Sequence, residues 1–167
     1  MKIALVQMSM GKEICENLDK SLKYCDMAEN CDLVFFPEIQ LTPFFPQYHD
    51  MCVDHYCIDM DHDALAGLCQ KAKKHHYYLS PMSIWNQKDP DTILPYGSHR
   101  REKSRTLRKM VHIAQKRKIF YEQDYYTPAE DGFKVFDTPF GKVGIVICFD
   151  RHMPESNPLL CIKKAQT

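Results

Sequence analysis

The sequence predicts a layered α/β domain, because short apolar runs typical of buried strands alternate with segments of helical period. The predicted order is strand, helix, strand, helix, strand and then, after an irregular stretch, a hairpin. The composition agrees, since 44% of the 167 residues are hydrophobic and 26% are charged, which is typical of a globular protein. No apolar run approaches the ~20 residues of a membrane span, so we expect no membrane partner.

Three strands and two helices are predicted in the first half of the chain. The apolar runs that predict strands lie at residues 2–7, 32–36 and 77–82. Apolar residues at every third or fourth position predict a helix from Ile14 to Ala28. A second helix is expected after an N-cap at Asp61 or Asp63. The apolar face of this second helix comprises Leu65, Leu68, Cys69 and Ala72.

The second half is less regular. Residues 83–107 have neither sustained alternation nor helical period, and they include two prolines and a glycine. Alternation returns at residues 133–137, and a nearly continuous apolar run at residues 143–149 predicts another strand. Turn residues separate these two segments, so we expect a hairpin.

Charge is segregated along the chain although the formal net charge is zero. Residues 100–118 carry nine basic residues and one acidic residue, which leaves 13 basic and 21 acidic residues elsewhere. Clustered cations favour nucleic acids through phosphate contacts. However, few aromatic residues lie among these cations, and no nucleic-acid-binding motif surrounds them. We therefore expect no nucleic-acid partner.

Eight cysteines are many for this length, but no C-x-x-C pair occurs. The first residues lack the apolar region of about 7–15 residues that a secretory signal needs, so we expect reduced thiols and a cytoplasmic location. Five residues have side chains that zinc favours: Cys52, His55, Cys57, His62 and Cys69. A matching second pair of spaced cysteines is missing, so we expect no metal.

Two residues occupy positions where open α/β sheets place their sites. Cys148 ends an apolar run and lies three residues before Arg151, a cation that favours the nucleophilic thiolate. Glu38 directly follows the apolar run at residues 33–37, where a carboxylate is suited to act as a general base. Taken alone, Cys148 is better explained as a small core residue, and Glu38 as a loop carboxylate.

Four segments together resemble the nitrilase superfamily, the carbon–nitrogen hydrolases. They are residues 2–8, 32–38, 108–113 and 141–155. Each segment is a modest match, but glutamate, lysine and cysteine motifs in the family's order are specific. The three family positions fall on Glu38, Lys109 and Cys148. Apart from the irregular stretch, the resemblance covers nearly all of residues 1–156.

The resemblance implies an αββα sandwich with Glu38, Lys109 and Cys148 as catalytic residues. Glu38 would take the thiol proton, Cys148 would attack an amide, N-carbamoyl or nitrile carbon, and Lys109 would stabilise the oxyanion. Glu122 matches an additional glutamate of the family that helps to position the substrate and the lysine. The resemblance implies no cofactor and no metal, and it makes a homo-oligomer the expected assembly.

The resemblance also bears on the substrate, which we expect to be a small molecule. Residues 42–46 and 125–128 resemble the N-carbamoylputrescine amidase branch. Arg151 is similar to the arginine with which N-carbamoyl amino acid hydrolases hold a substrate carboxylate; the alternative is a structural ion pair with Asp150 or Glu155. We expect an N-carbamoyl compound or a linear amide rather than a nitrile.

Two segments depart from the family pattern. Where the family has two strands leading into the lysine, residues 83–107 are irregular and end in basic residues. Family members continue through further strands and helices, whereas residues 157–167 match none of them. We therefore expect a truncated nitrilase-like domain over residues 1–156 with an unmatched tail. Two functions stay open: an active hydrolase, or a catalytically inactive member that binds a partner through the basic strip at residues 100–118.

Overall fold

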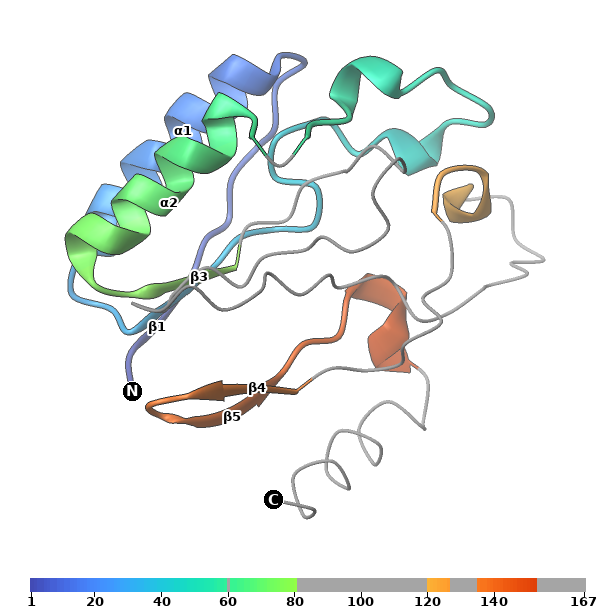
Figure 1. The fold of residues 1–167 in the computed structure, drawn as a ribbon. Coiled ribbons are helices and arrows are strands. Elements are labelled where there is room, and N and C mark those ends of the chain that lie inside the picture. The colour runs from blue at the N-terminus through green and yellow to red at the C-terminus, as the bar shows by residue number, and fades with distance from the viewer. Residues whose placement is uncertain (60, 81–119, 127–134, 153–167) are drawn as a thin grey trace. The chain divides into compact units, whose positions relative to one another are not determined.

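The computed structural model describes residues 1–59, 61–80, 120–126 and 135–152 (Figure 1). These residues belong to two compact units. One unit contains residues 1–45 and 50–80, and the other contains Pro46–His49 and the described residues from 120 onward. The predictions for the irregular stretch, the basic strip and the tail fall outside the described residues.

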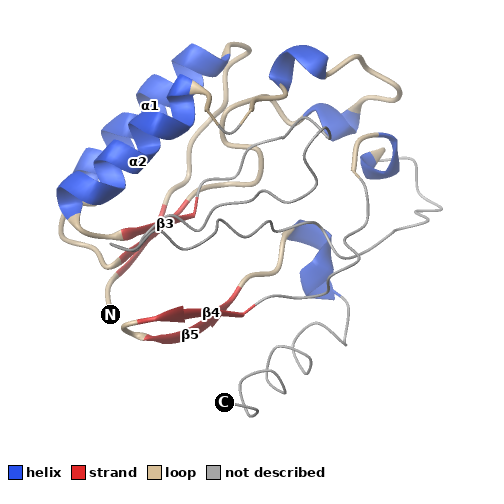
Figure 2. Cartoon of the chain, viewed as in Figure 1, coloured by secondary structure: helices blue, strands red, loops and turns tan. Residues whose placement is uncertain are grey.

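The first unit is a three-stranded parallel sheet with two helices, coloured by element type in Figure 2. In chain order its elements are β1 Ile3–Leu5, α1 Ile14–Met27, β2 Leu33–Phe35, α2 Asp63–His75 and β3 Tyr78–Ser80. The strand order is β1-β2-β3, with Val34 of β2 paired with Ala4 on one side and Leu79 on the other. The predicted alternation of strands and helices is confirmed. None of the described helices is long and apolar enough to cross a membrane.

The core of this unit lies between the two helices and one face of the sheet. Its buried residues are Cys25, Ala28, Val34, Phe36, Leu68, Ala72, Tyr77 and Leu79. Each fully buried aliphatic side chain contributes about 1.5–3 kcal/mol to folding. The apolar face predicted for α2 is confirmed, with Cys69 half-buried at its margin.

The prediction that β1 is a buried strand is wrong for one of its faces. Ile3 and Leu5 are 47% and 78% exposed, whereas Ala4 packs against the core. Successive side chains of a strand point to opposite faces, and α1 and α2 pack on the face that Ala4 shares with Val34. A short apolar run indicates a strand but does not say how many of its faces are covered.

The N-cap of α2 is His62 rather than either predicted aspartate. Its ring Nδ1 accepts a hydrogen bond from the main-chain N–H of Ala64, at 3.1 Å. Asp63 is instead the first helical residue, where a carboxylate interacts favourably with the positive end of the helix dipole. The helix ends at His75, and the C-cap residue His76 has a φ of 56°, in the left-handed region.

Charged side chains join the two helices at their C-terminal ends. The carboxylate of Asp26 on α1 accepts hydrogen bonds from Lys71 and from Nε2 of His75 on α2, the latter at 2.8 Å. The Lys74 ammonium lies 3.5 Å from the same carboxylate. Hydrogen bonds from Lys71 and His75 hold the pKa of Asp26 well below its ordinary value.

In the second unit, β4 Val135–Thr138 and β5 Gly141–Gly144 form an antiparallel hairpin. Gly141 has a φ of 115°, which a residue with a Cβ rarely adopts, so this turn requires glycine. Lys142 lies opposite Asp137, and their charged groups are 2.8 Å apart. The predicted hairpin is thereby confirmed.

The predicted continuous strand over residues 143–149 is wrong. β5 ends at Gly144, which pairs with Val135, the first residue of β4. Residues 145–147 therefore face no described partner strand and form no regular element. Four short 3₁₀ helices complete the described chain: Phe45–Gln47, Asp54–Tyr56, Glu122–Asp124 and Cys148–His152.

We predict that Asp26→Asn lowers stability at neutral pH much more than in acid. Because the folded pKa of Asp26 lies below the unfolded value of about 4, its contribution is fully present above that value and is lost as the pH falls below it. The urea midpoints of wild type and variant should therefore differ at about pH 6 and converge toward pH 2.

Asp137→Asn serves as the control, since it removes an exposed carboxylate that faces one lysine on a hairpin. Its effect should be small at every pH, because an exposed ion pair contributes little. An equal urea-midpoint difference for Asp26→Asn at pH 3 and pH 7 would contradict the role given to this carboxylate.

Candidate active site

Cys148 is the first residue of the 3₁₀ helix Cys148–His152, and its side chain is exposed. Its φ of 49° lies in the left-handed region. For a residue other than glycine this conformation costs of order 1–3 kcal/mol, and such strain concentrates at functional sites. The sequence placed this thiol at the end of a strand. The structure instead presents it on a sharp turn, the fourth residue after the end of β5.

The other described cysteines do not share this setting. All seven cysteines in the described part of the chain are free thiols. Burial raises the pKa of Cys25, Cys57 and Cys69, which keeps these thiols protonated. Cys15 and Cys52 are exposed, as Cys148 is, but among the described cysteines positive φ occurs only at Cys148. Backbone conformation therefore distinguishes this thiol from the rest.

Glu122 provides a carboxylate beside this thiol. It is the first residue of the 3₁₀ helix Glu122–Asp124 and is half-buried. The Sγ–H of Cys148 points to Oε1 of Glu122 across 4.0 Å. The structure thus brings together two predicted site residues that are 26 positions apart in the chain. A carboxylate at this distance can accept a hydrogen bond from a thiol or from an N–H group placed between the two.

The main chain on both sides of Glu122 is held by the segment Pro46–His49 of the same unit. The N–H of Tyr121 donates to the carbonyl oxygen of Pro46 at 2.6 Å. The hydroxyl of Tyr125 donates to the carbonyl oxygen of Tyr48 at 2.7 Å. These two bonds flank Glu122 and limit how far its main chain can move.

His49 adds two contacts to this arrangement. Its ring stacks on that of Tyr121, with centroids 4.9 Å apart and planes within 6°. Its Nδ1 lies 2.7 Å from Oδ2 of Asp124. Sequence reasoning did not identify these residues, although it singled out the neighbouring residues 42–46 and 125–128. The signal that could have found them is the concentration of aromatic residues in both segments.

Glu38 belongs to the first unit, where it follows β2 and begins a tight turn. The predicted position just beyond a strand end is confirmed, and its side chain is half-buried. The next residue, Ile39, has a φ of 54° although it is β-branched. Left-handed backbone thus directly follows Glu38 and also occurs at Cys148.

Arg151 is exposed, one turn after Cys148 in the same 3₁₀ helix. The contact that the structure gives its guanidinium is with His152, whose Nε2 lies 3.4 Å from Nε of the arginine. Asp150, which directly precedes Arg151, is buried, and its N–H donates to the carbonyl oxygen of Ile147 at 3.0 Å. Lys109 and Glu155 lie outside the described residues.

The five residues considered as zinc ligands all lie in the described part of the chain, where no three of them bring their ligand atoms together. His62 caps α2, and Cys69 is half-buried on the same helix. The thiol of Cys57 points to the carbonyl oxygen of Val53 at 3.7 Å. His62 and Cys57 thus make contacts within their own segments.

Comparison with known proteins identifies the family. The sequence pattern described as carbon–nitrogen hydrolase matches residues 2–163. The chain is 25% identical to a citrullinase of Francisella tularensis over 169 residues, which is 99% of this chain and 58% of that protein. It is 27% identical to the omega-amidase NIT2-B of Xenopus laevis over 172 residues, 99% of this chain and 60% of that protein.

A shorter match joins the chain to an N-carbamoylputrescine amidase of Arabidopsis thaliana, with 38% identity over 47 residues, 28% of this chain and 16% of that protein. Among solved structures, a carbon–nitrogen hydrolase from Helicobacter pylori G27 superposes with a TM-score of 0.78 at 21% identity. That match covers 98% of this chain and 56% of the solved chain.

The chain thus spans 58% and 60% of the two relatives that it matches over its whole length. The structural match confirms the predicted α/β fold of the nitrilase type. The boundary expected between residues 156 and 157 stays a prediction. Because the family's sequence pattern covers residues 2–163 and the fold agrees, this chain belongs to the carbon–nitrogen hydrolase family.

Proposed function

We propose that the protein hydrolyses the carbon–nitrogen bond of an N-carbamoyl compound or a linear amide, with Cys148 as the nucleophile. The observation that carries this proposal is the exposed Cys148 thiol on left-handed backbone, with the Glu122 carboxylate 4.0 Å from its Sγ. The relatives named N-carbamoylputrescine amidase and omega-amidase support a carbamoyl or amide group as the group attacked.

In the proposed reaction, Glu38 accepts the thiol proton and the sulfur of Cys148 forms a bond to the carbonyl carbon. The tetrahedral intermediate carries an oxyanion, which Lys109 stabilises. When this intermediate collapses, the carbon–nitrogen bond breaks and the nitrogen leaves with the proton as ammonia or an amine. Water activated by Glu38 then attacks the thioester, releases the acid and restores the thiol. The roles of Glu38 and Lys109 rest on the resemblance of their sequence segments to the family.

Glu122 is proposed to hold the leaving nitrogen or the substrate N–H beside the sulfur. Its Oε1 lies close enough to Sγ that a group bonded to the attacked carbon can reach both atoms. The bonds from Tyr121 and Tyr125 to the segment Pro46–His49 restrain the main chain that carries this carboxylate. A carboxylate held in this way orients a substrate without paying the entropy of ordering a mobile side chain.

Arg151 is proposed to select a substrate that carries a carboxylate. Its guanidinium is exposed three residues after the nucleophile, and the contact described for it is with the imidazole of His152 rather than with a carboxylate. Planar guanidinium groups bind carboxylates through two parallel hydrogen bonds, which fixes orientation as well as charge.

We predict that the wild-type protein releases ammonia from at least one of three probes: N-carbamoylputrescine, an N-carbamoyl amino acid and an ω-amide of a dicarboxylic acid. Cys148→Ala should lower kcat by about 10³-fold or more, because no other described thiol has the same setting. Cys15→Ala, which removes an exposed thiol on α1, is the matched control and should retain full activity. No turnover of any probe by folded wild-type protein would refute the proposal.

We predict that Glu122→Gln slows turnover but speeds alkylation of Cys148 by iodoacetamide at pH 7. A nearby carboxylate repels the negatively charged thiolate, so replacing it by a neutral amide should raise the alkylation rate by a few-fold. At the same time kcat should fall by about 10–100-fold, because the group that orients the substrate is lost. Asp137→Asn, in the same unit, should change neither rate. Unchanged alkylation would show that Glu122 does not act on the sulfur.

We predict that Arg151→Gln raises KM for an N-carbamoyl amino acid by about tenfold or more and leaves KM for N-carbamoylputrescine, which has no carboxylate, within about twofold. Arg151→Lys should fall between wild type and glutamine, since it keeps the charge but loses the bidentate geometry. Equal changes for both substrates would assign Arg151 a structural role instead.

A further inference from the structure

Helix α1 buries two polar side chains on the face that the sequence predicts to be apolar. Asn17 and Ser21 are both 0% exposed. A buried amide or hydroxyl costs about 1–3 kcal/mol when it lacks hydrogen bonds, so polar residues persist in a core when partners satisfy them. The partners of these two side chains explain why they are present.

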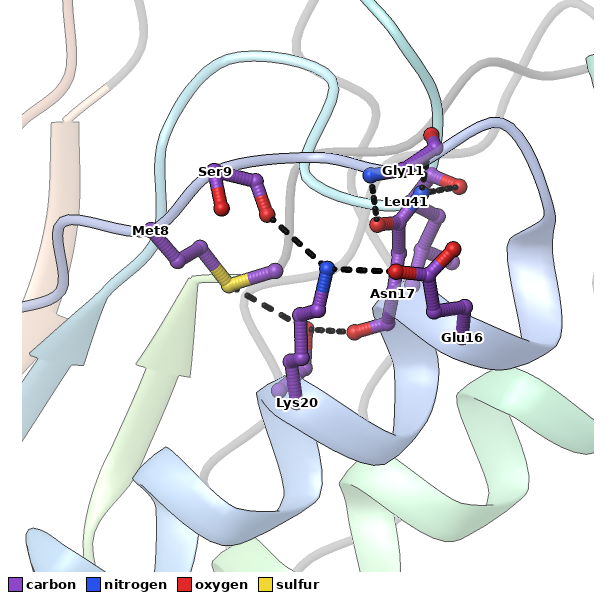
Figure 3. A network of polar contacts seen from close by, with 8 residues as sticks. Met8, Ser9, Gly11, Glu16, Asn17, Lys20 and Leu41 are labelled. Carbon is purple, nitrogen blue, oxygen red and sulfur yellow. Dashed lines mark hydrogen bonds and ion pairs between the residues drawn. The ribbon is translucent and has the colours of Figure 1, made fainter.

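The carboxamide of Asn17 connects two loops, as Figure 3 shows. Its Oδ1 accepts from the N–H of Gly11 at 2.6 Å, and its Nδ2 donates to the carbonyl oxygen of Gly11 at 3.0 Å. The same Nδ2 donates to the carbonyl oxygen of Leu41, also at 3.0 Å. Gly11 belongs to the loop that leaves β1, and Leu41 to the turn that leaves β2. One side chain therefore ties together the segments that follow the carboxyl ends of two neighbouring parallel strands.

A second contact reaches the same turn. Nε2 of Gln40, a fully buried residue, donates to Oγ of Ser21 at 3.2 Å. The Ser21 hydroxyl in turn donates to the carbonyl oxygen of Asn17 at 2.8 Å, within α1. Gln40 and Leu41, the two residues that follow Ile39, are thus hydrogen-bonded to Ser21 and Asn17, which lie one turn apart on α1.

The loop that leaves β1 has a weaker, exposed link to α1. Nζ of Lys20 lies 3.3 Å from the carbonyl oxygen of Ser9 and 2.8 Å from the carboxylate of Glu16 (Figure 3). The ion pair with Glu16 lies within α1, so the single exposed bond from Lys20 to Ser9 is all that this lysine gives the loop. The buried amide of Asn17, which bonds both loops, therefore provides most of the restraint.

The turn at residues 38–41, which Asn17 contacts through Leu41, contains an unfavourable backbone conformation that other contacts must stabilise. Ile39 has a φ of 54°, which is unfavourable for a β-branched residue by about 1–3 kcal/mol. The N–H of Thr42 donates to the carbonyl oxygen of Ile39 at 3.2 Å and closes the turn. The side chains of Ile39 and Leu41 are buried, which offsets part of the cost. Glu38 immediately precedes the strained residue, so the path of its main chain depends on this turn.

We propose that Asn17 is a positioning residue for Glu38: through the carbonyl oxygen of Leu41 it holds the turn after β2, and the turn sets the direction of the Glu38 carboxylate. The inference rests on the proposed role of Glu38 as the base. Proton transfer requires heavy atoms at hydrogen-bond distance, and a displacement of about 1 Å costs about 100-fold in rate. Loss of the amide therefore lowers the rate of the chemical step and leaves substrate binding nearly unchanged.

The test compares Asn17→Ala with Tyr77→Phe. The control removes another buried hydrogen bond to α1, from the Tyr77 hydroxyl to the carbonyl oxygen of Cys25 at 3.1 Å, without touching the turn. Amide hydrogen exchange is measured in peptides that cover residues 36–42. The values of kcat and KM are measured at a temperature at which both variants are folded. Asn17→Ala should raise exchange in these peptides about tenfold and lower kcat about 10–100-fold, with KM within about twofold. Tyr77→Phe should do neither.

If Asn17→Ala does not fold, Asn17→Asp replaces it. The aspartate has nearly the same volume and still accepts from Gly11, but it presents an oxygen instead of an N–H to Leu41, so the same changes are expected. Unaltered exchange at residues 36–42, or a kcat equal to that of Tyr77→Phe, overturns the inference. Raised exchange together with an inactive wild-type protein overturns the proposed function while it leaves the restraint of the turn intact.

Discussion

The packing of α1 and α2 against one face of the parallel sheet is the interaction on which the first unit depends. Val34 and Leu79 are neighbours in the sheet, and they meet Cys25 and Leu68 from the two helices in one buried cluster. This apolar burial stabilises the unit enough to hold polar and strained groups at its margin. Because α1 lies against the sheet, its side chains Asn17 and Ser21 reach the loops that leave β1 and β2.

In the second unit, the candidate site residues are positioned by irregular backbone and loop contacts rather than by helix packing on a sheet. Its described regular structure is a short hairpin, and Cys148 and Glu122 both begin 3₁₀ helices outside it. Glu122 is held by main-chain and aromatic contacts with Pro46–His49, a segment far away in the sequence. Cys148 is presented by left-handed backbone. In both units, therefore, candidate catalytic groups lie beside irregular backbone rather than within strands or helices.

Much of the fold could be predicted from local sequence patterns. Helical period located α1 within one residue at its C-terminal end, and apolar runs located the three parallel strands and the hairpin. Predictions failed where the outcome depends on a partner: β1 is covered on one face, β5 stops where β4 begins, and the cap of α2 is His62. The same limit explains why the burial of Asn17 on α1 was not predicted, since its hydrogen-bond partners Gly11 and Leu41 lie in loops.

For the candidate site, the sequence by itself determined the family, because motifs around Glu38 and Cys148 have specific local contexts in a specific order. It also indicated Glu122, which the structure places beside the thiol. Only the tertiary structure decided how these groups are held. The left-handed conformations of Ile39 and Cys148 are unfavourable for an isolated chain. They persist because surrounding contacts stabilise them by more than the backbone strain costs. Those contacts, such as the bond from Asn17 to Leu41 across 24 residues, exist only after the helix has packed on the sheet.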